Sequence, residues 1–101
     1  MTTLIGPIDV EEVRPVLFDF TGELKTGETL AAASPVEVTV QAGTDPTPAN
    51  LLSGSAVISG SMVQQLVKGS VNNVFYHLRC VATTSLGSTL VVVANLRVET
   101  F

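Results

Sequence analysis

Few side chains in this 101-residue chain could do chemistry. There is one histidine, His77, and one cysteine, Cys80. They are three positions apart in a segment of strand-like alternation, and odd spacing on a strand places two side chains on opposite faces. The pair therefore cannot share a metal ion, and without a second His or Cys a zinc site is excluded. The sequence predicts an outward-facing His77 and a buried, reduced Cys80.

Acidic residues gather toward the N-terminus, but not at the spacing of a metal-binding loop. Asp9, Glu11 and Glu12 form one group, and Asp19 and Glu23 form another. Calcium needs six or more oxygen ligands at a defined spacing, which neither group provides. The Gly-x-Ser-x-Gly and Gly-x4-Gly-Lys-Ser/Thr motifs are also missing. We expect solvated carboxylates, no cofactor, no metal, no small-molecule substrate and no enzymatic activity.

Charge is scarce and uneven. Charged residues make up 14% of the chain, and none lies at positions 46–67 or 80–96, whereas about 25% is usual. There is no basic stripe of the kind that binds nucleic acid, no apolar run of membrane-spanning length and no signal-peptide pattern. We expect a protein made in the cytoplasm, without membrane insertion, whose charge-poor surfaces are covered by neighbouring subunits.

Alternation with a period of two residues dominates the chain and predicts an all-β fold. In residues 14–21, Val16, Phe18 and Phe20 share the inner face, and in residues 28–33 Leu30 and Ala32 point inward. Residues 42–54 form a long loop with prolines, and glycine suits the turn of the last hairpin. The predicted strands are residues 14–21, 28–33, 36–41, 55–59, 62–67, 74–84 and 89–99.

The strand at residues 74–84 carries a further pattern. Tyr76, Leu78, Cys80 and Ala82 fall on one face and precede the sequence Thr-Ser-Leu-Gly. This resembles the tyrosine-corner strand of immunoglobulin-like and fibronectin-III-like domains, which implies a buried ring whose hydroxyl bonds to the main chain. With seven strands in about 100 residues, we expect a two-sheet antiparallel β-sandwich of immunoglobulin-like or fibronectin-III-like type, spanning residues 14–101.

Residues 1–13 are expected to form an extended N-terminal arm. The segment is apolar and has no obvious strand partner within the domain. One interpretation is a clip that adds to a sheet edge or groove of a neighbouring protein; the alternative is a simple first strand or a frayed terminus. The candidate partner-binding residues are Leu4, Ile5, Pro7, Ile8 and Val10.

Three stretches resemble the fibre-tail adaptor family of tailed bacteriophages. The first, residues 18–30, contains an aromatic-Asp-aromatic strand followed by a Gly-Glu-Thr-Leu strand. The second, residues 67–76, has a glycine-containing turn before a strand with tyrosine. The third, residues 83–87, reads Thr-Thr-Ser-Leu-Gly. The resemblance implies an immunoglobulin-like sandwich present in the virion in several copies. It also implies a role in joining tail or baseplate components to receptor-binding fibres.

Composition and resemblance together predict a non-catalytic virion structural protein, a tail or head-tail adaptor. We expect it in the tail region, as a homo-oligomer that also contacts other tail or fibre proteins. One alternative is a module that binds carbohydrate or cell-surface ligands through the loops at residues 42–54 and 68–73. Another is a small enzyme or metalloprotein that depends on His77, although no reaction can be named for it.

Overall fold

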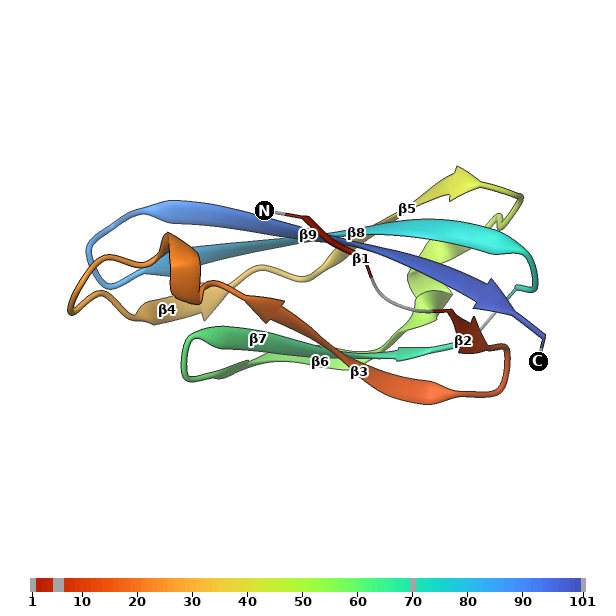
Figure 1. The fold of residues 1–101 in the computed structure, drawn as a ribbon, viewed down its shortest axis with the longest axis horizontal. Helices are drawn as coiled ribbons and strands as arrows, with labels where there is room; N and C mark the ends of the chain where they lie inside the picture. The colour runs from red at the N-terminus through yellow and green to blue at the C-terminus, as the bar shows by residue number, and fades with distance from the viewer. Residues whose placement is uncertain (1, 5–6, 70, 101) are drawn as a thin grey trace.

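The computed structural model describes residues 2–4, 7–69 and 71–100, and these ranges fold as two packed β-sheets (Figure 1). All seven predicted strands are present, and two short strands precede them, so the all-β sandwich is confirmed. The elements in chain order are β1 (Thr2–Leu4), β2 (Ile8–Asp9), β3 (Val13–Asp19), the 3-10 helix η1 (Thr21–Glu23), β4 (Leu30–Ala33), β5 (Glu37–Ala42), the 3-10 helix η2 (Pro48–Leu51), β6 (Leu52–Ser59), β7 (Met62–Lys68), β8 (Val74–Thr84) and β9 (Thr89–Glu99).

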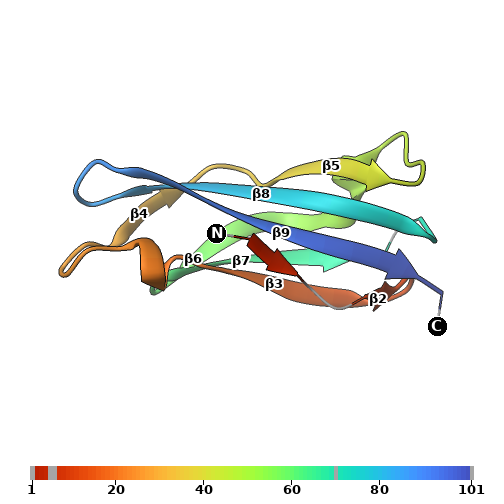
Figure 2. The ribbon, with the colours of Figure 1, turned by 45° about the horizontal axis from the view of Figure 1, so that its top comes forward.

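The smaller sheet has the order β3-β7-β6, and the larger sheet is built around the long hairpin β8–β9. Strands β4 and β5 pair with the free side of β8, while β1 and β2 pair with the free side of β9. Figure 2 shows the two layers from a second direction, with β9 and β8 crossing above β3 and β7. The larger sheet is mixed, because β1 and β2 run parallel to β9. The predicted antiparallel β-sandwich is confirmed, because the described pairs among β3 to β9 are all antiparallel, and the parallel pairs come from the two short strands within residues 1–13.

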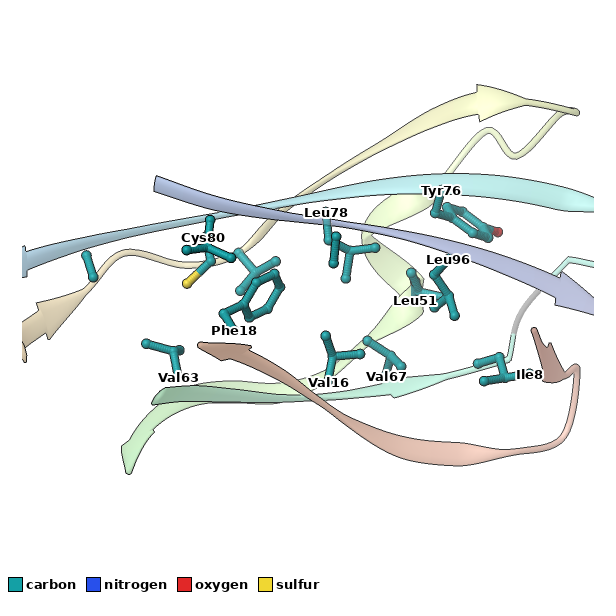
Figure 3. Close-up of a cluster of buried hydrophobic side chains, with 14 of the residues drawn as sticks. Ile8, Val16, Phe18, Leu51, Val63, Val67, Tyr76, Leu78, Cys80 and Leu96 are labelled. Carbon is teal, nitrogen blue, oxygen red and sulfur yellow. The ribbon is translucent and has the colours of Figure 1, made fainter. Parts of the chain in front are cut away.

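The core lies between the two inner faces, where alternate residues of each strand meet. Val16, Phe18 and Phe20 are buried as predicted, opposite Tyr76 and Leu78 of β8. Figure 3 shows Val16 and Phe18 of one sheet and Tyr76 and Leu78 of the other pointing into the space between the two sheets. In a closely packed core, each buried methylene group adds to the free energy of unfolding, so the inner faces supply most of the fold's stability.

Two details of the predicted core are wrong. Ala32 is exposed, because a β-bulge between Leu30 and Ala32 shifts the register of β4 against β8 and rotates the following side chain outward. Residues 42–54 are not all loop, because η2 begins at Pro48 and β6 begins at Leu52. Proline is accepted in the first turn of a helix, where its missing N–H has no partner to lose. The turn buries Leu51 completely.

The N-terminal segment has a partner within the chain. In the parallel ladder Thr2 lies opposite Val93, and Ile8 lies opposite Val98. Ile8 is 1% exposed and belongs to the core. Gly69 lets the backbone of residues 9–10 approach closely, since a Cβ there would lie 2.2 Å from the carbonyl oxygen of Asp9. Residues 8–10 therefore pack as part of the sandwich, in keeping with the simple first strand considered as an alternative.

Candidate interaction surfaces

The outer face of the smaller sheet carries a group of neighbouring apolar side chains. Strand β3 contributes alternate residues, which all point away from the core, and β7 and β6 add one each. Pro15 lies opposite Leu66, while Leu17 and Val57 lie on either side of the half-buried Gln64. We call this group the exposed apolar face; it consists of Val13, Pro15, Leu17, Val57 and Leu66.

These side chains keep much of their surface in water. Val13 is 60% exposed, Leu17 48%, Val57 59% and Leu66 39%, and Pro15 is exposed as well. Single exposed apolar residues are ordinary, whereas a group of them on one sheet face is the kind of surface that protein–protein contacts use. The inward side chains of the same strands already form the core, so folding does not depend on burying this outward group.

Opposite charges flank the exposed apolar face at its two ends. Asp19 lies opposite Met62 at one end of the β3–β7 pair, and Lys68 lies opposite Val13 at the other. The Asp19 carboxylate accepts a hydrogen bond from the Thr21 N–H at 2.9 Å. Hydrogen bonds from Thr21 lower the pKa of Asp19, which keeps it negative. The face is thus an apolar centre with a negative and a positive end.

The outer face of the larger sheet is different. Its outward side chains on β8 and β9 include ionic and hydrogen-bonding groups that find partners on the same surface. Arg79 lies 3.9 Å from Glu37, and Arg97 lies 2.9 Å from Glu99. These ion pairs are partly exposed and each contributes little to stability. The charged groups of this face are therefore paired within the chain, and the outward apolar residues Phe75, Val81, Val91 and Val93 beside them are half-buried.

The two residues singled out for chemistry lie as predicted, on opposite sides of β8. His77 is half-buried on the outer face, where its Nδ1 and Asn95 Oδ1 lie at a hydrogen-bond distance of 3.0 Å. Cys80 is fully buried, and burial raises the pKa of its thiol to about 11, so the thiolate is not formed near neutral pH. Within the described ranges, no group of three or more His, Cys, Asp and Glu side chains could hold a metal ion.

The predicted arm residues are divided between the core and the surface. Ile8 is buried, Val10 is half-buried against the core, and Pro7 is exposed. Leu4 lies in β1 at the register position of Asn95, and Ile5 lies outside the described residues. A partner-binding role for this segment stays a prediction. The Ile8 side chain is already buried in the core, so it is not free to contact a partner.

Two buried carboxylates attach loops to β8. The Tyr76 hydroxyl donates to Asp45 Oδ2 at 2.6 Å, and the Thr84 hydroxyl donates to Glu28 Oε2 at 2.5 Å. The resemblance implied a bond from the Tyr76 hydroxyl to the main chain, and the bond to Asp45 takes that role here. Hydrogen bonds from Tyr76 and from Thr84 lower the pKa of Asp45 and of Glu28 respectively, so both carboxylates are charged acceptors at neutral pH.

The loops considered for carbohydrate binding show no aromatic platform among the residues that can be described. Phe18, Phe20 and Tyr76 are buried, and Phe75 is half-buried on β8. The loop at residues 42–54 turns Leu51 and Asp45 inward. No helix in the described ranges is long and apolar enough to cross a membrane.

A β-sandwich with an exposed apolar sheet face has a surface suited to contact with other proteins. Comparison with protein families narrows the class of protein. The family model for the podophage GP4 fiber-tail adaptor protein gp77 matches residues 9–97, which is most of the chain. The chain therefore belongs to this family and is a structural adaptor of the phage tail. A search of curated proteins found no match.

Proposed function

We propose that the chain is a non-catalytic structural protein of the virion, a tail or head-tail adaptor that joins tail or baseplate components to fibres. The exposed apolar face is the observation that carries this proposal. A surface of that kind lowers its free energy when another protein covers it. The working parts of the molecule are then its faces, edges and loops, and its rigid core holds them in place.

Strand order supports an immunoglobulin-like topology for this adaptor. If β1 is counted with β2 and β4 with β5, the chain supplies seven strand positions in succession. The second, fifth and fourth positions form β3-β7-β6, while the third, sixth and seventh form the other sheet with β8 at its centre. This corresponds to the B-E-D and C-F-G strands of an immunoglobulin constant-type domain. The first position departs from that type, since β1 and β2 lie beside β9.

The exposed apolar face fits a second copy of the chain. Asp19 and Lys68 lie at equal distances, three residues, from the centre of the β3–β7 pair at Val16 and Gln65. Two copies packed face to face with antiparallel strands therefore bring Asp19 of each copy near Lys68 of the other. Their apolar centres meet between these two ion pairs. Such a self-complementary contact is the usual basis of a two-fold dimer, and complementary charge fixes its direction.

Charge reversal tests the dimer at these two positions. Asp19→Lys alone and Lys68→Asp alone place like charges together at both ends, so each variant should shift toward monomer. An equimolar mixture of the two variants restores both attractive pairs, so the mixture should form a heterodimer. The measurement is light scattering coupled to size exclusion chromatography, at low and at high salt. Two variants that dimerise as well as the parent, or a mixture that stays monomeric, would contradict this arrangement.

With the apolar face covered by a second copy, other surfaces remain for tail and fibre proteins. The tip of the β8–β9 hairpin presents Leu86, which is 63% exposed. Glu28 and Thr84 hold the adjoining turn in place, and the Thr29 N–H donates to the Ser85 hydroxyl at 3.1 Å. A rigid loop with an apolar tip suits insertion into a neighbouring subunit.

A further inference from the structure

A small cavity opens where the edge of the smaller sheet meets the crossing between β4 and β5. Its volume is about 180 Å3. One wall is formed by residues 33–36 and the other by Leu52 and residues 54–56, with Gln65 between them. Most of these side chains are small, so the walls are largely main chain and methyl groups. The cavity lies between the sheets and is separate from the exposed apolar face.

Gln65 is the buried polar residue of this cavity and is 1% exposed, whereas the other polar lining residues, Ser34 and Ser55, are exposed. Its Nε2 donates to the carbonyl oxygens of Leu66 at 2.9 Å and Gly54 at 3.1 Å. These bonds fix the orientation of the side-chain amide. Its Oε1 accepts no hydrogen bond from the described part of the chain. Every fully buried polar side-chain atom in that part has a hydrogen-bond partner. Oε1 therefore keeps some contact with solvent. Oε1 is therefore an acceptor that a molecule entering the cavity can reach.

The edge strand beside the cavity is irregular in a way that keeps the cavity open. Ser53 pairs with Leu66 and Val57 pairs with Gln64, so residues 54–56 of β6 stand opposite Gln65 alone. Gly54 takes a φ of +76°, which permits this bulge. Strand β6 pairs with β7 on one side, and its other side is a sheet edge. An extended segment can bind along such an edge and place one side chain in an adjacent cavity.

We propose that this cavity binds a tyrosine side chain carried on an extended segment of a partner protein. A cavity of roughly 150 Å3 holds a benzene ring in another protein, so 180 Å3 accommodates a phenol. The ring contacts Ala56, Pro35 and the methyl-lined walls, and the phenolic O–H donates to Gln65 Oε1. A buried acceptor rejects a ring that lacks the donor, because it would lose its solvent without gaining a partner. The partner's main chain meanwhile extends the sheet at β6.

Peptide binding followed by amide chemical shifts tests the proposal on the full chain. The probe is an acetylated, amidated five-residue peptide with tyrosine at its centre, flanked by valine and threonine. A peptide with phenylalanine at the centre is the matched control, and free p-cresol and toluene are the small-molecule pair. We expect saturable shifts at residues 33–36 and 54–56, with the tyrosine peptide binding about ten times more tightly than the phenylalanine peptide.

Variants separate the cavity from the rest of the surface. Ala56→Leu fills the cavity and should weaken binding of the tyrosine peptide at least about ten-fold. Ala33→Leu fills it from the opposite wall and serves if the first variant does not fold. Thr39→Leu, on the outer face of the larger sheet, should bind like the parent. Equal binding of the two peptides, unchanged binding in the filled variants, binding of p-cresol but not of the peptide, or no saturable shift would each overturn the proposal.

This proposal does not depend on the dimer. The dimer uses the outer face of the smaller sheet, and the charge-reversal variants leave the cavity untouched. A monomeric chain that binds the tyrosine peptide would retain the cavity proposal and remove the dimer. A dimer that ignores the peptide would do the reverse.

Discussion

The two outer faces of this sandwich share one backbone design but differ in chemistry. On the larger sheet, Glu37 pairs with Arg79 and His77 pairs with Asn95, so polar groups satisfy one another within the chain. On the smaller sheet, Leu17 and Leu66 stand in water with apolar neighbours. The difference teaches that folding uses the inward half of each strand and leaves the outward half free for function. Among the described residues, the more exposed apolar side chains lie on the smaller sheet's outward half, which is why we propose that a partner covers it.

The largest expected effect is on the free energy of unfolding, and it compares a buried residue with an exposed residue of the same strand. Phe18 is fully buried and Leu17, its neighbour on β3, is 48% exposed. Phe18→Ala should lower the free energy of unfolding by about 3–5 kcal/mol, because it leaves a cavity in the core. Leu17→Ala should change it by less than about 0.5 kcal/mol. Urea denaturation followed by circular dichroism measures both, and equal losses would show that the outer face contributes to folding.

The next effect is on association and compares the two outer faces directly. Leu17→Glu buries a carboxylate in the proposed dimer contact, so the dimer dissociation constant should rise at least about 100-fold. Thr39→Glu makes the matched change on the larger sheet and should leave the dissociation constant unchanged. Sedimentation equilibrium gives both constants. If Thr39→Glu dissociates the dimer and Leu17→Glu does not, the polar face is the true contact.

A smaller effect concerns pH and the carboxylates that hold loops to the larger sheet. The pKa values of Asp45 and Glu28 are lowered by hydrogen bonds from Tyr76 and Thr84. A lowered pKa contributes stability above the unfolded-state pKa, and that stability is lost as pH falls through the folded-state value. The protein should therefore lose stability as pH falls below about 4.

Tyr76→Phe isolates the share of this pH dependence that belongs to Asp45. The variant should melt on the order of 5 °C lower at pH 7, because a buried charged acceptor loses its donor. Its stability should also fall less steeply in acid, since the pKa of Asp45 returns toward its ordinary value. Thermal melts from pH 7 to pH 3 measure both. Parallel curves for the variant and the parent would show that this bond does not set the acid response.

The smallest effect is expected on the paired polar face. His77→Ala removes one partly buried hydrogen bond to Asn95, and the melting temperature should fall by no more than about 5 °C. The oligomeric state should not change. Calorimetry and light scattering check the two expectations, and a loss of assembly in this variant would place the contact on the larger sheet.

Much of the fold was predictable because alternation records which face of a strand is buried. Val36, Val38 and Val40 are buried or half-buried, as their spacing indicated, and Gly87 takes the positive φ that its hairpin needs. Alternation fails at bulges, which is why it predicts the wrong face for Ala32. It also cannot show that Ile8 pairs with β9, because a parallel partner far along the chain leaves no local signal.

The surfaces were harder to predict, since they depend on register between distant strands. The outward position of Leu17 follows from its own strand, but its grouping with Leu66 and Val57 requires the pairing of β3, β7 and β6. The cavity beside Gln65 depends on a bulge whose only sequence signal is Gly54. Contacts of this kind come from tertiary packing, which a single sequence does not encode locally.

The most direct test of the central claim is the mass of the parent chain, measured by light scattering after size exclusion over a hundred-fold range of concentration. If the exposed apolar face joins two copies, the mass should be twice that of the 10.5 kDa chain at high concentration and should fall only on strong dilution. A mass of one chain at every concentration would contradict the dimer, and the apolar face would then belong to a different tail or fibre protein.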